Sequence, residues 1–136
     1  MNRTLYSCLF YLALPLVALR LWLRARKAPA YAKRVGERFS YGLPRMQPGG
    51  IWVHAVSVGE SIAAAPMIRA LLERYPQLPI TVTCMTPTGS ERIQALFAGE
   101  PRIQHCYLPY DLPWAAARFL NRVQPKLAVI METELW

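Results

Sequence analysis

The sequence is poor in histidine and cysteine, and this shortage narrows the chemistry that the chain can support. Its 136 residues include two His and three Cys. Cys8, Cys84 and Cys106 are scattered and form no C-x-x-C pair, so we expect no disulfide framework, no zinc site and a reducing compartment. His54 and His105 lie in apolar runs without a neighbour at ligand spacing, and both are interpreted as structural. We therefore expect no metal and no cofactor.

Acidic residues are also scarce, and the common phosphate-binding motifs are missing from the sequence. The chain has 16 Lys or Arg against eight Asp or Glu, and no G-x-G-x-x-G or P-loop motif. Nine of the basic residues and one acid fall in residues 1–50, whereas residues 51–136 hold seven of each. The whole excess charge of +8 thus lies beside an apolar segment, which favours an anionic membrane surface as partner and argues against nucleic acid.

The N-terminus carries the longest apolar run. Residues 4–19 contain no charge, and if Arg20 snorkels the run extends to Leu23, close to the roughly 20 residues of a spanning helix. A signal peptide cleaved at 28–30 and a buried core helix are alternatives, but the basic cluster after the run fits neither. We expect a membrane anchor whose basic flank stays in the cytoplasm. That flank comprises Arg24, Arg26, Lys27, Lys33, Arg34 and Arg38.

Apolar runs alternate with helical patterns in the rest of the chain. We predict strands at 51–58, 80–85, 103–108 and 127–131, and helices at 60–75, from the 86–90 turn to about 97, and 114–123. Such alternation predicts an α/β fold with a Rossmann-like parallel sheet, covered on both faces. The predicted organisation is an anchor and basic segment (1–39), a Gly- and Pro-rich linker (40–50) and a sheet domain (51–136). Because the chain stops just after a strand, we expect it to be the front part of a longer protein.

Polar segments follow each predicted strand. In parallel sheets, ligands bind at the carboxyl ends of the strands, so these segments should lie close together. They are 57–60, 86–90, 109–111 and 132–136, and they contribute the carboxylates Glu60, Asp111, Glu132 and Glu134. Three of them also have a structural interpretation: a first-turn acid at Glu60, a helix cap at 86–90 and an exposed strand end at Glu132.

Four sequence motifs carry a family resemblance. IWVHAVSVGE (51–60), ITVTCMTPTGSER (80–92), YLPYD (107–111) and METELW (131–136) resemble the 3-deoxy-D-manno-octulosonic acid (Kdo) transferases, in the same order along the chain. The resemblance implies the N-terminal domain of a GT-B glycosyltransferase, which takes the lipid A precursor, while a C-terminal domain takes CMP-Kdo. It places the catalytic base at Glu60 and stabilisation of the transition state at Glu132. The predicted acceptor-binding residues are Ser57, Gly59, Thr88, Gly89 and Ser90.

The resemblance implies an inverting enzyme on the cytoplasmic face of the inner membrane, in lipopolysaccharide biosynthesis. A positioned carboxylate would take the proton of the acceptor hydroxyl, and a second would stabilise an oxocarbenium-like centre. Without the donor-binding half, this chain alone is expected to be inactive. Two alternatives stay open: a non-catalytic, membrane-anchored lipid-binding module, and a sugar-nucleotide epimerase of similar two-domain architecture.

Overall fold

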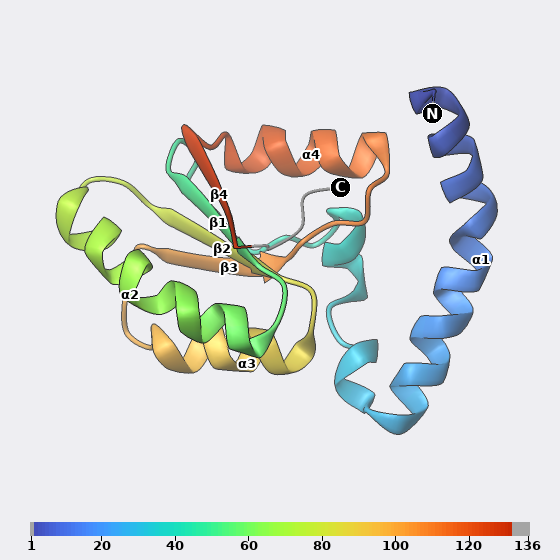
Figure 1. Cartoon of the computed structure of the whole chain (residues 1–136), viewed down its shortest axis with the longest axis horizontal. Coiled ribbons are helices and arrows are strands. Elements are labelled where there is room, and N and C mark those ends of the chain that lie inside the picture. The colour runs from blue at the N-terminus through green and yellow to red at the C-terminus, as the bar shows by residue number, and fades with distance from the viewer. Residues whose placement is uncertain (1, 132–136) are drawn as a thin grey trace.

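The computed structural model describes residues 2–131, which form four helices of the α type and a four-stranded sheet (Figure 1). The strands are β1 (Ile51–Ala55), β2 (Ile80–Cys84), β3 (Ile103–Tyr107) and β4 (Leu127–Met131). The helices are α1 (Arg3–Lys27), α2 (Val58–Arg74), α3 (Pro87–Leu96) and α4 (Pro113–Val123). Two short 3₁₀ helices, η1 (Pro29–Ala32) and η2 (Val35–Phe39), follow α1.

The sheet is parallel throughout, in the order β3-β2-β1-β4. Val53 in the centre of β1 is paired with Val82 of β2 on one side and with Val129 of β4 on the other. The chain builds outward from β1 to β3 and then returns to the other side of β1. A reversal of this kind is a topological switch point, where doubly wound sheets bind their ligands. The predicted Rossmann-like α/β fold is confirmed.

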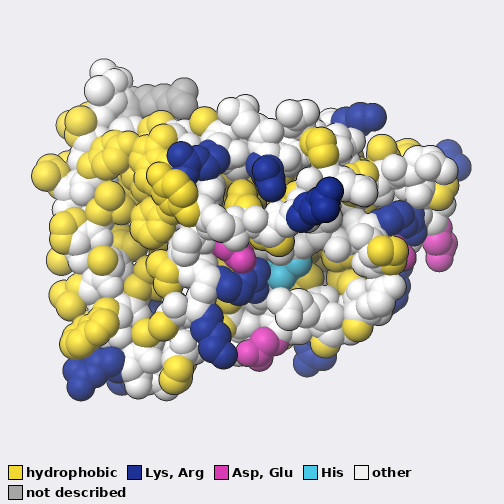
Figure 2. Space-filling view, turned by 180° about the vertical axis from the view of Figure 1, so that it is seen from behind, with side chains coloured by type: hydrophobic (Ala, Val, Ile, Leu, Met, Phe, Trp, Pro, Cys, Tyr) yellow, Lys and Arg dark blue, Asp and Glu magenta, His cyan; other side chains and the backbone are white. Residues whose placement is uncertain are grey.

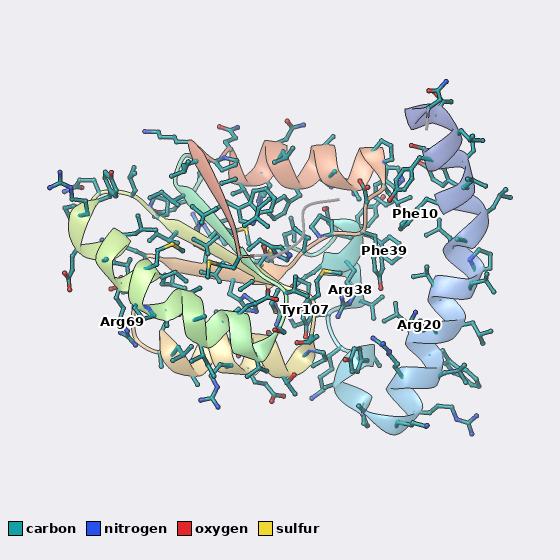
Figure 3. All side chains as sticks on the ribbon, viewed as in Figure 1. Phe10, Arg20, Arg38, Phe39, Arg69 and Tyr107 are labelled. Carbon is teal, nitrogen blue, oxygen red and sulfur yellow. The ribbon has the colours of Figure 1, made fainter. Side chains whose placement is uncertain are left out.

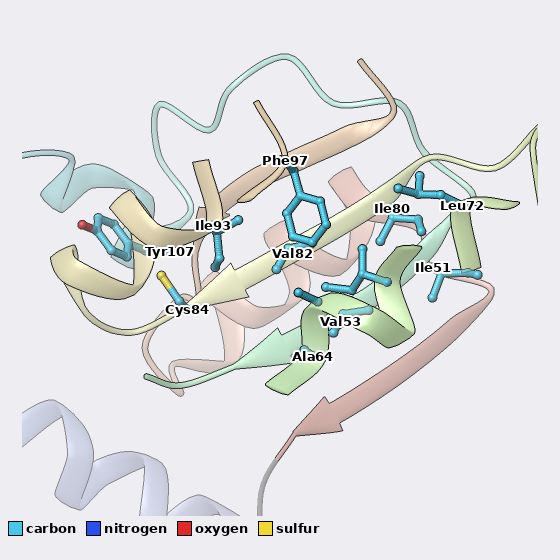
Figure 4. Packing of buried hydrophobic residues seen from close by; sticks show 12 residues of the cluster. Ile51, Val53, Ala64, Leu72, Ile80, Val82, Cys84, Ile93, Phe97 and Tyr107 are labelled. Carbon is cyan, nitrogen blue, oxygen red and sulfur yellow. The ribbon is translucent and has the colours of Figure 1, made fainter. Parts of the chain in front are cut away.

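Helices cover both faces of the sheet, as the continuously apolar strands predict. α2 and α3 lie on one face and α4 on the other (Figure 1). On the first face, Val53, Val82 and Ile93 are almost fully buried in the main core (Figure 4). On the second, the Trp52 and Phe119 rings pack edge to face with centroids 5.1 Å apart.

The helix starts agree with local capping chemistry. The Ser57 side chain caps α2 and the Thr86 side chain caps α3, in each case by accepting a hydrogen bond from a backbone N–H of the first turn. Proline stands at the first position of α3 and of α4, where no intrahelical N–H is needed. β1 ends at Ala55, earlier than the predicted 58, because the caps require the chain to leave the sheet first.

α1 is a single helix that lies along the domain (Figure 1). The segment of residues 4–27 is long and apolar enough to span a membrane, and no residue of its most apolar stretch is buried. Six of its leucines recur at alternating spacings of four and three, which places them on one exposed face of the helix. This leucine stripe comprises Leu5, Leu9, Leu12, Leu16, Leu19 and Leu23. Figure 2 shows hydrophobic side chains gathered over this part of the molecule.

The segment between α1 and β1 belongs to the folded body. Ser40 Oγ donates to the carbonyl of Ala115 in α4 at 2.7 Å, and Met46 packs with Phe119 in a second core cluster. Glu37 and Arg38 are buried, with Arg38 only 3% exposed. The expectation that Arg38 belongs to a lipid-facing basic flank is therefore wrong, because its guanidinium points into the protein. The charge count alone could not show that direction.

Candidate active site at the carboxyl edge of the sheet

Backbone hydrogen bonds join the segments that follow β1, β2 and β3. Met85 N donates to Val56 O at 3.1 Å, and Leu108 N donates to Cys84 O at 3.0 Å. Helix α3 begins beside the segment that follows β1, because an ideal Cβ on Gly89 would lie 3.6 Å from the carbonyl carbon of Ser57. Three of the four polar segments are thus brought together at the predicted edge. The fourth begins at Glu132, so Glu132 and Glu134 lie outside the described residues.

β4 ends at the same edge of the sheet as β1. Its last described residue, Met131, is paired with Ala55 at the end of β1. Ser57 and Glu60 follow Ala55 closely in the chain, and Glu132 follows Met131. The described parts of β1 and β4 therefore end side by side at the switch point, and the roles assigned to Glu60 and Glu132 stay predictions.

Glu60 is partly buried in the first turn of α2. Its Oε2 accepts a hydrogen bond from Val56 N at 2.5 Å, while its own N–H points to Ser57 Oγ at 3.5 Å. This arrangement resembles a capping box, so the structural interpretation of Glu60 has direct support. Among the described residues, however, Oε1 has no hydrogen-bond partner. One oxygen thus fixes the carboxylate and the other is free to accept a proton.

The two glycines at this edge differ in what the fold requires of them. A Cβ on Gly89 would lie 2.9 Å from Thr86 Oγ1 and 3.5 Å from Cys84 Cβ, so packing against the capping threonine demands glycine there. Gly59 is exposed, and its nearest neighbour would be Ser57 Oγ at 4.0 Å. Packing therefore does not require glycine at this position, and the role of Gly59 in binding the acceptor stays a prediction.

We expect Gly59→Ala to separate activity from stability. Alanine favours helix over glycine by about 0.5–1 kcal/mol, so the free energy of unfolding should stay constant or rise. The new methyl group would crowd the edge and should lower catalytic activity of the full-length protein roughly tenfold or more. Gly89→Ala should instead lose stability through its contact with Thr86. Equal activity in Gly59→Ala and the wild type would show that no ligand approaches this turn.

Ser90 is only 2% exposed, and its hydroxyl is engaged inside the protein. Arg34 Nη1 donates to Ser90 Oγ at 2.7 Å, and Ser90 Oγ lies 2.7 Å from His105 Nε2. His105 Nδ1 lies 2.8 Å from the carbonyl of Val82 and must donate to it, so Nε2 accepts the Ser90 proton. In this arrangement Ser90 fixes the basic segment to the sheet. Thr88, by contrast, is exposed at the same turn.

Burial lowers the pKa of His105 from its ordinary 6.5 to about 4. The unfolded chain therefore binds a proton as the pH falls below 6.5, whereas the folded protein stays neutral down to about pH 4. Stability is fully present above pH 6.5 and is lost as the pH falls. Through His105, we expect the free energy of unfolding to fall by about 2 kcal/mol as the pH is lowered from 7 to 5. Urea unfolding at both pH values should show a smaller loss in His105→Gln, and equal losses would contradict this assignment.

A partly buried ion pair, with Arg34 partly exposed and Glu37 buried, holds η2 against the end of β3. Arg34 Nε and Nη2 each donate to a carboxylate oxygen of Glu37 at 2.7 Å, and Tyr107 N donates to Glu37 Oε2 at 3.0 Å. The Arg34 and Arg38 guanidinium carbons lie 4.6 and 4.3 Å from the Tyr107 ring centroid. Arg38 Nη2 also donates to Met85 O at 3.0 Å. The sequence patterns did not predict this cluster, although Glu37 is the one acid among the nine basic residues of positions 1–50, which was a signal of a specific partner.

The other polar groups of interest also have structural roles. The Tyr6 hydroxyl of α1 is hydrogen-bonded to Asp111, so this edge carboxylate ties α1 to the domain. Cys84 and Cys106 are buried free thiols, as predicted, and burial raises the pKa of Cys84 to about 11. His54 Nδ1 lies 2.9 Å from Thr83 Oγ1 in the core. Within residues 2–131, no three His, Cys, Asp or Glu side chains are grouped so as to hold a metal ion.

A parallel sheet covered by helices on both faces, preceded by an N-terminal apolar helix, defines the class as an α/β domain of the doubly wound type. Comparison with known proteins identifies the family. The family model for 3-deoxy-D-manno-octulosonic-acid transferase (kdotransferase) matches residues 33–136. The chain belongs to this family of glycosyltransferases, and its domain is the N-terminal one, as predicted.

Curated relatives agree along the whole chain. A 3-deoxy-D-manno-octulosonic acid transferase of Haemophilus influenzae is 48% identical and aligns with 100% of this chain but 32% of its own length. One from Bordetella pertussis is 40% identical, with 100% and 33% covered. A probable mitochondrial transferase of Arabidopsis thaliana is 38% identical, with 97% and 29% covered. The chain thus spans about a third of the curated relatives that it matches. No solved structure matches it.

Proposed function

We propose that this chain is the acceptor-binding part of an inverting transferase that moves Kdo from CMP-Kdo to the lipid A precursor, lipid IVA. The observation that carries the proposal is the Glu60 carboxylate. It lies at the carboxyl edge of a parallel sheet, beside the switch point, with one oxygen held by Val56 N–H and the other without a partner among the described residues. Membership of the family supplies the reaction class, and this geometry supplies a candidate base.

The proposed chemistry needs no covalent intermediate. The acceptor hydroxyl loses its proton to Glu60 Oε1 as its oxygen attacks the anomeric carbon of Kdo. The bond to CMP breaks, and the positive charge that develops on the sugar is stabilised by the carboxylate of Glu132. Single displacement inverts the anomeric configuration. In this proposal Gly59 and Thr88, both exposed at this edge, and the partly buried Ser57 contact the acceptor, whereas Gly89 and Ser90 are buried and only hold the turn in place.

The proposed acceptor is a lipid, and α1 supports a location at the membrane. Its leucine stripe faces away from the domain, with Leu12 76% exposed. At the end of the helix, Arg26 lies over the exposed Trp22 ring, 5.0 Å from its centroid, which is a typical pairing at a lipid interface. Our proposal places the domain at the cytoplasmic face of the inner membrane, within reach of a lipid acceptor. The donor site lies in the part of the relatives that this chain does not span, and the chain alone is expected to be inactive.

The test is a transfer assay on the full-length protein. Purified protein in detergent is incubated with CMP-Kdo and lipid IVA, and mass spectrometry follows the lipid while release of CMP is measured separately. We expect the lipid to gain the mass of Kdo in proportion to the CMP released. Release of CMP without a modified lipid would contradict the proposed acceptor. No release of CMP and no modified lipid would instead favour a lipid-binding module without catalysis.

A further inference from the structure

A pocket of about 420 Å³ separates α1 from the carboxyl edge of the sheet. One wall is the inner side of α1, with Val17 and Leu21, and the other is formed by the ends of β1 and β2, with Val56 and Met85. The pocket therefore touches the same two segments that frame the candidate site. Its remaining lining residues are Arg20, Arg24, Tyr31, Arg38, Thr86 and Tyr110.

Three arginines and no acid line this pocket. Arg38 comes from η2, whereas Arg20 and Arg24 are separated by one turn of α1 and extend from the same side of the helix. Figure 3 shows Arg20 on α1 and Arg38 near Tyr107 across from it. Glu37, next to Arg38 in the chain, is already bound by Arg34 and Tyr107 N, and Glu60 accepts from the N–H of Val56 in the pocket wall. Among residues 2–131, the pocket lining thus carries three positive charges and no carboxylate.

Arg38 is the most informative of the three. Burying a guanidinium is costly unless its N–H groups are satisfied, and only 3% of Arg38 is exposed. Nη2 is bound by Met85 O, but Nε is buried and has no hydrogen-bond partner among the described residues. Arg38 thus lines a cationic pocket with a guanidinium that is charged and only partly hydrogen-bonded. An anion is the ligand that satisfies such a group.

We propose that this pocket binds a phosphate monoester, of the kind carried by a lipid head group. Guanidinium groups bind phosphate through paired N–H donors, and a monoester offers three terminal oxygens and about two negative charges. The apolar walls formed by Val17, Leu21 and Val56 suit the uncharged part of the same molecule. The location of the pocket beside the candidate site makes the acceptor its natural occupant, and that part of the inference rests on the proposed function.

The test measures binding without transfer. Full-length protein in neutral detergent micelles is titrated with phosphatidic acid, a monoester, and with phosphatidylglycerol, a diester, at matched micelle charge. We expect tighter binding of phosphatidic acid, and we expect Arg20→Gln and Arg24→Gln to weaken it about tenfold each. Arg26→Gln is the matched control, because Arg26 lies on the same helix but does not line the pocket. It should keep the preference for the monoester. Circular dichroism checks that α1 and the domain remain folded.

Competition with inorganic phosphate then tests whether the phosphate group of the lipid, and not its apolar part, occupies the pocket. Displacement of phosphatidic acid by phosphate in the wild type, but not in Arg24→Gln, would show that the phosphate group itself occupies the pocket. Equal binding of the two lipids, or equal losses in Arg24→Gln and Arg26→Gln, would overturn the proposal. Because binding is measured without CMP-Kdo, a protein that transfers no Kdo can still pass this test, and an active transferase can fail it.

Discussion

Glu60→Gln in the full-length protein is expected to lower the rate of Kdo transfer at least about 100-fold, since general base catalysis contributes roughly 10²–10⁴-fold. The amide has the shape of the carboxylate, and its oxygen can still accept the hydrogen bond from Val56 N. What it cannot do is take the proton of the acceptor hydroxyl. Lipid binding and the free energy of unfolding should therefore change little.

Glu73→Gln is the matched control for this experiment. Glu73 lies on the same helix, α2, but is exposed near its other end, so its replacement should leave transfer unchanged. Steady-state rates for both variants, with urea unfolding of each, separate catalysis from folding. A Glu60→Gln protein within tenfold of the wild-type rate would mean that Glu60 is only a capping residue. A large loss of stability would point to the same conclusion.

Glu37→Gln is expected to destabilise the protein by about 3 kcal/mol, the largest stability effect that we predict. The carboxylate accepts from three donors, two on Arg34 and one on the Tyr107 amide. A glutamine of the same shape offers one acceptor oxygen and places N–H donors opposite the others. The Tyr107 amide or the Arg34 guanidinium then loses its partner, although Arg34 is 31% exposed and can recover some hydration.

Chemical denaturation measures the loss, and hydrogen exchange at the Tyr107 amide locates it. Glu100→Gln is the control: Glu100 also pairs with an arginine, Arg102, but both side chains are about a third exposed, so its replacement should change stability little. Similar losses of stability in Glu37→Gln and Glu100→Gln would show that burial does not strengthen the Glu37–Arg34 pair. Unchanged exchange at Tyr107 would show that η2 is held by other contacts.

The sheet could be predicted from the sequence because each strand is a short apolar run bounded by Gly, Pro or a capping residue. Strand β4, 127–131, was predicted with its observed bounds, and the others differ only where the chain turns toward a helix cap. The parallel order follows from the intervening helices. The meeting of Ser57, Glu60 and Thr88 at one edge follows from the same topology, since parallel strands all end there.

The packing of the basic segment could not be predicted in this way. A count of charges shows that Arg34 and Arg38 follow an apolar helix, but their direction depends on tertiary partners: Ser90, Met85 and the Tyr107 ring. Those partners come together only once β2 and β3 are in register, with Val82 beside His105. Local patterns contain no information about such long-range contacts, and the pocket beside Arg38 was missed for the same reason.

The leucine stripe of α1 has a kinetic consequence. α1 is joined to the edge of the sheet through Tyr6 and Asp111 and through the partly buried pair at η2, so an enzyme attached to lipid by this helix would hold its site at a fixed height above the bilayer. The search for acceptor then takes place in two dimensions, where the effective concentration is set by the surface. The rate would follow the mole fraction of acceptor in the membrane, and inert lipid would dilute it at constant bulk concentration.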